Sequence, residues 1–168
     1  MLDASPQARL YSSTGALYGC DGGRRTRLGA LSATRLAPAT RISLFALAGR
    51  YAAIDSAQMG IDTFDSTVSI YDLASGRRVG TAPGTTPEDR AESFITVAAL
   101  AVNRNGVLAW IGRRSAIGVP QPTYELHILS AGKNTLLATS TAKLAGLQLT
   151  LTAVSWADAG GVRHSAHL

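Results

Sequence analysis

Three acidic residues in one short segment are the first candidates for chemistry. Asp55, Asp62 and Asp65 lie within Asp-Ser-Ala-Gln-Met-Gly-Ile-Asp-Thr-Phe-Asp, and carboxylate oxygens are the ligands that calcium prefers. Their spacing matches no calcium-binding loop, so the sequence favours a solvated turn over a cation site. We therefore expect no metal ion and no cofactor here.

Two histidines and one cysteine are the next candidates. His164 and His167 are three residues apart in Arg-His-Ser-Ala-His-Leu, and residues with this spacing on a strand point to opposite faces, which argues against a shared metal ion. Cys20 is the only cysteine, which excludes an intrachain disulfide and every Cys-x-x-C site. It follows Leu17 and Tyr18, so we expect a half-buried structural thiol rather than a nucleophile.

The sequence carries no signature of a known catalytic site. It contains no Gly-x-Ser-x-Gly elbow, no phosphate-binding loop and no dinucleotide fingerprint. We therefore expect no catalytic residues and favour a protein that is not an enzyme. The enzymatic alternative is a small lyase or hydrolase that uses loop carboxylates such as Asp62, Asp65 or Glu125.

Two pairs of adjacent arginines are the candidate interaction residues: Arg24 with Arg25, and Arg77 with Arg78. Each pair follows a glycine turn, and guanidinium groups that converge on one surface favour phosphate or carboxylate partners. The pairs predict a weak anion-binding rim. The alternative is that they keep turns and edge strands soluble and discourage edge pairing.

The overall charge supports no particular partner. The formal net charge is +5, and 14 of the 16 basic residues are arginine, but these occur singly or in pairs rather than in runs. We find no specific nucleic-acid signal. No apolar stretch is long enough to predict a membrane span, and the N-terminal residues lack the pattern of a secretory signal. The compartment stays open, with export as one option.

The elements that must position these residues are strands. Apolar and polar residues alternate with period two in three segments, 42–54, 95–111 and 147–156, which is typical of strands with one buried face. A helix over 97–102 is the competing interpretation, but β-branched neighbours and Gly106 argue against it. The sequence therefore predicts an all-β fold with antiparallel hairpins.

The hairpins recur along the chain. When Gly76 is placed on Gly132, the flanking segments align at an offset of 56 residues, and Gly23 lies 53 residues before Gly76. We divide the chain, as one domain over 1–168, into four repeat units: 8–30, 42–82, 95–140 and 146–168. Units of about 50 residues with four strands are typical of propeller blades. The alternatives are an open β-array or a β-sandwich.

The repeat division leads to further predictions about packing, loops and ring closure. Trp110 and Trp156 hold equivalent positions and are expected to pack between neighbouring units. We expect long loops over 55–66 and 112–123, and a helical turn within 86–92. If the ring closes, residues 8–13 should pair with residues 162–167; otherwise a second chain must cover the ends.

Three segments resemble known repeat proteins. Val-Ser-Ile-Tyr-Asp-Leu-Ala-Ser-Gly-Arg over 68–77 and Asn-Gly-Val-Leu-Ala-Trp-Ile over 105–111 resemble the strand and turn pattern of WD40-like β-propellers. The segment 147–166 resembles the closing hairpins of actinobacterial propeller-type proteins, many of which are exported. The resemblance implies an antiparallel β-propeller-like array of about four short blades, and it brings no catalytic residues.

Together these observations predict a non-enzymatic, propeller-like binding or interaction module. Its partner would be a protein or an extracellular polymer bound on a loop face. A further alternative is a structural homo-oligomer in which incomplete edge units are completed between chains.

Overall fold

The computed structural model describes residues 1–31, 40–60, 63–87 and 93–168, and these residues contain fifteen strands and no helix. All strand pairs but one are antiparallel. The prediction of an all-β fold is confirmed, and the segment 97–102 lies within a strand. No helix in the described part of the chain is long and apolar enough to cross a membrane.

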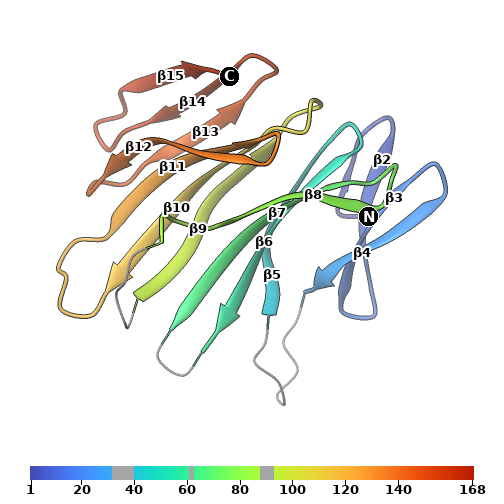
Figure 1. Cartoon of the computed structure of the whole chain (residues 1–168), viewed down its shortest axis with the longest axis horizontal. Helices are drawn as coiled ribbons and strands as arrows, with labels where there is room; N and C mark the ends of the chain where they lie inside the picture. The colour runs from blue at the N-terminus through green and yellow to red at the C-terminus, as the bar shows by residue number, and fades with distance from the viewer. Residues whose placement is uncertain (32–39, 61–62, 88–92) are drawn as a thin grey trace.

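The first sheet is a meander of four strands in chain order (Figure 1). They are β1 (Asp3–Ala4), β2 (Ala8–Ser13), β3 (Ala16–Asp21) and β4 (Arg24–Ala30). Thr14 and Gly15 form a two-residue turn between β2 and β3, both with positive φ, the conformation that matches the right-handed twist of a hairpin. This turn fixes which side chains meet across the first sheet.

The central eight strands form two further meanders. The second sheet contains β5 (Thr40–Ala48), β6 (Tyr51–Met59), β7 (Phe64–Asp72) and β8 (Arg77–Pro83). The third sheet contains β9 (Ser93–Val102), β10 (Leu108–Ala116), β11 (Thr123–Ser130) and β12 (Lys133–Ser140). A single parallel pair, Phe64 with Phe94, connects them. Through this pair the eight strands form one continuous sheet, and we name its two meanders the second and third sheets.

The last sheet has three strands in the order β13-β14-β15. They are β13 (Ala145–Leu149), β14 (Ala153–Ala157) and β15 (Arg163–His167). β15 pairs with β14, so its other side is an edge of the sheet.

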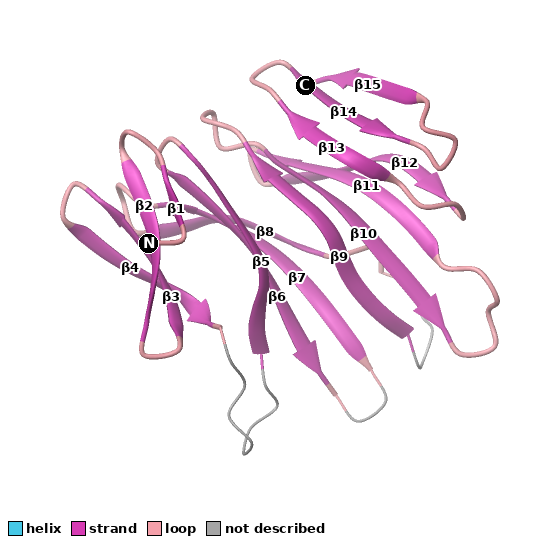
Figure 2. Ribbon diagram, turned by 180° about the vertical axis from the view of Figure 1, so that it is seen from behind, coloured by secondary structure: helices cyan, strands magenta, loops and turns pink. Residues whose placement is uncertain are grey.

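The four sheets follow one another as layers, with an apolar cluster between each neighbouring pair (Figures 1 and 2). Leu10, Leu17 and Ile54 lie between the first and second sheets. Val68 and Trp110 lie between the second and third sheets, and a third cluster, with Ile111 and Val154, joins the third and last sheets. Alternation along each inner strand supplies two such layers, one on each face.

The first and second sheets approach each other closely at a glycine. A Cβ on Gly19 would lie 2.4 Å from Cδ2 of Leu73, which lies in the turn between β7 and β8 of the second sheet. A larger residue would push the first two sheets apart, so glycine at this position permits the contact that buries Leu73.

The loops expected over 55–66 and 112–123 are much shorter than predicted, and in the second range only residues 117–122 lie outside strands. Residues 55–59 continue β6, residues 64–66 begin β7, and residues 112–116 continue β10. Polar residues interrupt the apolar alternation in these stretches, but the backbone ladders continue through them. Of the helical turn expected within 86–92, residues 86–87 are not helical and residues 88–92 lie outside the described residues.

The expected pairing of residues 8–13 with residues 162–167 does not form. β2 pairs with β1 and β3, and β15 pairs with β14. The first and last sheets lie at opposite ends of the array (Figures 1 and 2). Because the strand β1 already occupies the free edge of β2, the first sheet completes itself instead of the last.

Candidate functional sites

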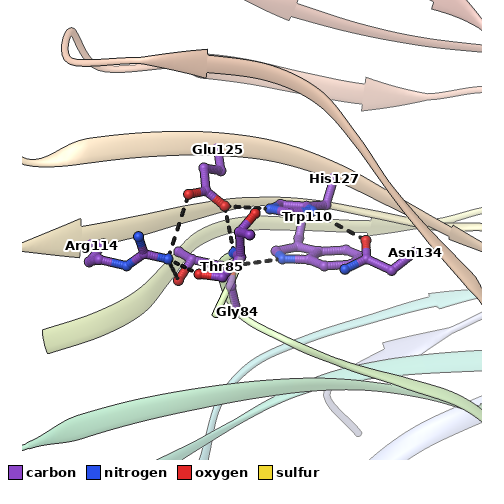
Figure 3. A network of polar contacts seen from close by, with 8 residues as sticks. Gly84, Thr85, Trp110, Arg114, Glu125, His127 and Asn134 are labelled. Carbon is purple, nitrogen blue, oxygen red and sulfur yellow. Dashed lines mark hydrogen bonds and ion pairs between the residues drawn. The ribbon is translucent and has the colours of Figure 1, made fainter. Parts of the chain in front are cut away.

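A buried polar network lies between the second and third sheets (Figure 3). Trp110 on β10 and His127 on β11 are cross-strand partners, and their rings stack with centroids 5.0 Å apart and an interplanar angle of 8°. The indole nitrogen of Trp110 donates to the carbonyl of Gly84 at 2.9 Å. This bond ties β10 to the connection between β8 and β9.

Glu125 is the charged centre of this network. Its Oε2 lies 2.8 Å from Nε2 of His127 and accepts from the backbone N–H of Thr86 at 2.6 Å. Its Oε1 lies 3.6 Å from the Arg114 guanidinium. Burial alone would raise the pKa of Glu125, but the bonds from Thr86 and His127 and the Arg114 charge outweigh it and hold this pKa below its ordinary value.

Arg114 completes the ring of contacts around the connection between sheets. Its guanidinium donates to the Thr85 hydroxyl at 2.8 Å and to the carbonyl of Thr86. On the other side of the network, Oδ1 of Asn134 on β12 lies 3.2 Å from Nδ1 of His127. The network thus joins three adjacent strands of the third sheet to residues 84–86.

The network is sealed from solvent. The side chains of Arg114, Glu125 and His127 are 6%, 5% and 2% exposed. Gly112 shows how tightly residues 84–86 cover it, since a Cβ there would lie 1.9 Å from the carbonyl oxygen of Gly84. Both oxygens of Glu125 are already bound by neighbours, so this arrangement fixes the connection over β10 by charge-assisted hydrogen bonds.

A second Trp–His pair of the same kind lies in the last sheet. Trp156 on β14 and His164 on β15 are cross-strand partners, and their ring centroids are 5.6 Å apart. Nε2 of His164 lies 3.0 Å from Oδ2 of Asp158, and both side chains are exposed, His164 to 43% and Asp158 to 38%. The hydrogen bond from His164 lowers the pKa of Asp158.

Asp55 is a buried acid with incomplete partners. It is 1% exposed on β6, and the Ser43 hydroxyl donates to its Oδ2. Its Oδ1 and the Ser66 hydroxyl make no hydrogen bond of good geometry among the described residues. Burial raises the pKa of Asp55, and the Ser43 and Ser66 hydroxyls oppose this only in part.

An exposed Arg–Tyr face covers the outer side of the first sheet. Its residues come from two rows across β2, β3 and β4, one with Arg9, Cys20 and Arg25 and the other with Tyr11, Tyr18 and Arg27. Tyr11 and Tyr18 stack with centroids 5.8 Å apart, and the Arg25 guanidinium lies 3.8 Å from the Tyr18 ring centroid.

The Arg–Tyr face combines charge with aromatic surface. All three of its arginines are exposed, and both tyrosines are partly exposed. A hollow of about 370 Å³ lies between the end of β4 and the start of β5, against Arg27 and Arg41. A hollow of about 220 Å³ lies on the Arg–Tyr face against Met1, Arg9 and Tyr11. A guanidinium stacked on a ring keeps its N–H groups free in one plane to bind an oxyanion.

The structure separates the four arginines predicted from the sequence. Arg25 belongs to the Arg–Tyr face, whereas Arg24 donates to the carbonyl of Ser75 in the turn before β8 at 3.4 Å. Arg77 and Arg78 are exposed at the start of β8. The contact of Arg24 with Ser75 brings the turn before β4 next to the turn before β8, and the anion-binding rim stays a prediction.

The acidic residues and histidines considered in the sequence do not come together in one site. Asp55 and Asp65 lie on adjacent strands, but Asp55 is buried and Asp65 is exposed, and Asp62 lies outside the described residues. Within residues 1–31, 40–60, 63–87 and 93–168, no cluster of three potential metal ligands forms. His164 and His167 point to opposite faces of β15, as their spacing predicted.

The Arg–Tyr face was missed at the sequence level. The signal that would have found it is the two-residue turn Thr14-Gly15, which sets Tyr11 opposite Tyr18. The buried network could not be found in this way, because residues 84–86 reach Glu125 through the packing of two sheets.

Comparison with known proteins informs the fold alone. No family model matches the chain, and no curated protein matches it. A solved structure described as the crystal structure of the computationally designed Ika4 protein superposes with a TM-score of 0.52 at 13% identity, covering 98% of this chain and 88% of that one. The likeness extends over nearly the whole chain, so it concerns the arrangement of all four sheets.

Proposed function

We propose that the chain is a non-enzymatic binding module, built as a propeller-type array, whose Arg–Tyr face binds an anionic polymer. Four successive meanders with apolar layers between them support the propeller-type arrangement. The observation that carries the binding proposal is the Arg25 guanidinium, held over Tyr18 on an exposed sheet face.

The charge of this face favours an anion. Arg9, Arg25 and Arg27 share the face with Tyr11, Tyr18, Cys20 and small residues, and no acidic residue occupies either row. Phosphate, sulfate or carboxylate groups would bind the guanidinium groups, and a sugar or base would lie against the partly exposed Tyr11 ring.

The burial of Glu125 argues against the enzymatic alternative. Glu125 is shielded and already bonded to Thr86, His127 and Arg114, whereas Asp65 is exposed on β7. The open edge of β15 favours instead a second candidate, an assembly in which a strand from outside completes the last sheet.

Binding of heparin and of a single-stranded oligonucleotide tests the first proposal. We expect the double substitution Arg9→Gln with Arg27→Gln to weaken heparin binding about tenfold and to reduce its salt dependence. The control, Arg77→Gln with Arg78→Gln, removes the same charge elsewhere and should leave most of the affinity. Equal losses in both variants would favour a diffuse charge effect or the outer rim and would refute the Arg–Tyr face.

Tyr11→Ala separates stacking from charge. If a ring or base of the polymer lies on Tyr11, affinity falls about fivefold without a change in the salt dependence, as expected for loss of one stacking contact. A larger loss for the oligonucleotide than for heparin would identify a nucleic acid as the polymer, and the reverse would identify a polysaccharide.

A further inference from the structure

The open edge of β15 differs from the corresponding edge of the third sheet. In the third sheet, β12 pairs along β11 from Tyr124 to Ser130 and contributes Asn134, whose Oδ1 lies 3.2 Å from Nδ1 of His127. In the last sheet, no described strand pairs with the outer side of β15, which holds the matching His164.

The two histidines use their first ring nitrogen alike. Nε2 of His127 is bound by Glu125, and Nε2 of His164 is bound by Asp158. Nδ1 of His127 is the atom that the outer strand reaches. If His164 uses its two ring nitrogens as His127 does, its Nδ1 is the atom that a strand added beside β15 would contact.

The backbone of β15 is arranged to receive such a strand. The N–H of Leu168 donates to the carbonyl of Thr152 at 3.0 Å, so even-numbered residues direct their backbone groups toward β14. Since backbone direction alternates along an antiparallel strand, Arg163, Ser165 and His167 direct their N–H and C=O groups to the open edge. Unpaired groups in a row are a template for strand addition.

The side chains of β15 select the partner by charge. Its five residues are Arg163, His164, Ser165, Ala166 and His167, with no acid among them. Two copies of β15 paired antiparallel about Ser165 would place Arg163 opposite His167 of the other copy, which leaves each Arg163 without an acidic partner. A strand with acidic residues at those positions would give Arg163 an ion pair that a second copy of β15 does not offer.

We propose that the edge of β15 binds an extended acidic segment of another protein as a fourth strand, with a side-chain carbonyl directed at His164. This deepens the second candidate function above and does not depend on the Arg–Tyr face, which lies at the other end of the array. The segment carries an acidic residue opposite Arg163 and another opposite His167. It carries an asparagine or acid opposite Ala166, the position that corresponds to Asn134 opposite Leu129.

A synthetic peptide with the order Thr-Glu-Asn-Thr-Val-Glu-Val places these groups in antiparallel register. Its control replaces both glutamates by lysine. Binding is followed by the fluorescence of Trp156, because Trp110 is fully buried in the cluster between the second and third sheets. We expect the acidic peptide to shift the Trp156 emission to shorter wavelength and the lysine peptide to bind about tenfold more weakly.

Ser165→Pro tests the strand addition itself. Proline removes one N–H from the open edge and none from the ladder with β14, so the thermal midpoint should stay close to that of the wild type while peptide affinity falls about tenfold. Ser165→Thr is the matched control and should bind normally.

Four outcomes refute the proposal. They are no binding of the acidic peptide, equal binding of both peptides, unchanged affinity in Ser165→Pro, and a wild-type dimer that Ser165→Pro dissociates. The last outcome would assign the edge to a second copy of the chain. Loss of heparin binding in the Arg9 and Arg27 variant leaves the peptide result unchanged, so the two proposals fail separately.

Discussion

The third and last sheets use the same Trp–His pair under opposite conditions. Trp110 and His127 are covered on every side, whereas Trp156 is partly exposed and His164 is 43% exposed. Both histidines bind a carboxylate through Nε2. The stacked pair therefore forms between two adjacent strands in both sheets, and the residues that cover it determine how much solvent reaches it.

The carboxylate comes from different positions in the two sheets. In the third sheet, the residue two positions after Trp110 is Gly112, which the carbonyl of Gly84 approaches too closely for any side chain. The acid is then Glu125, on the histidine's own strand. In the last sheet, the residue two positions after Trp156 is Asp158, and this residue binds His164 directly. Where residues 84–86 cover the Trp–His pair, a glycine occupies position 112 and the carboxylate is therefore supplied by Glu125 instead.

The largest expected effect breaks the buried pair. Trp110→Ala removes a fully buried indole and the bond to Gly84, and should lower the free energy of unfolding by about 3–5 kcal/mol. Trp156→Ala, its counterpart, should cost about 1–2 kcal/mol because its indole is only half-buried. Urea denaturation of both variants measures the difference. Equal losses of unfolding free energy in the two variants would mean that burial of the Trp–His pair adds nothing to stability.

The acids sharpen the comparison. Glu125→Gln leaves the Arg114 charge buried without its carboxylate and should cost about 3 kcal/mol at neutral pH. Asp158→Asn, at an exposed site, should change stability little.

The pH dependence has a definite sign. Because the pKa of Glu125 is lowered in the folded state, its contribution is fully present above the ordinary carboxyl pKa and is lost as the pH falls through the lowered value. The wild type should therefore lose its advantage over Glu125→Gln in acid. A constant difference across this range would contradict the assigned charge.

The smallest expected effect concerns a buried acid that lacks full partners. The pKa of Asp55 is raised by burial, so its protonated form favours folding below the ordinary carboxyl pKa, and this contribution is lost as the pH rises through the raised value. Asp55→Asn should therefore stabilise the protein by about 1 kcal/mol at neutral pH and lose this benefit in acid. Thermal unfolding at two pH values measures it; destabilisation at neutral pH would show that the carboxylate is needed.

Local patterns predicted the strands well and the contacts between sheets poorly. The alternation over 95–111 and the turn at Gly106 define β9 and β10 because both depend on neighbouring residues. The polar continuation of β6 was missed because Asp55 is acceptable inside a layer only beside Ser43. The Arg–Tyr face could be deduced from one tight turn, whereas the partners of Glu125 depend on how residues 84–86 cross β10.

The single bridge between Phe64 and Phe94 has a consequence for local stability. With so little backbone pairing between the second and third sheets, each meander keeps its own ladder, and neighbours are coupled mainly by side chains and by residues 84–86. We therefore expect such a molecule to open in steps, as stacked repeat proteins do, and the outermost meanders to exchange their amide hydrogens first. We expect the slowest amide exchange in β6, β7, β10 and β11, which lie in the interior of their sheets.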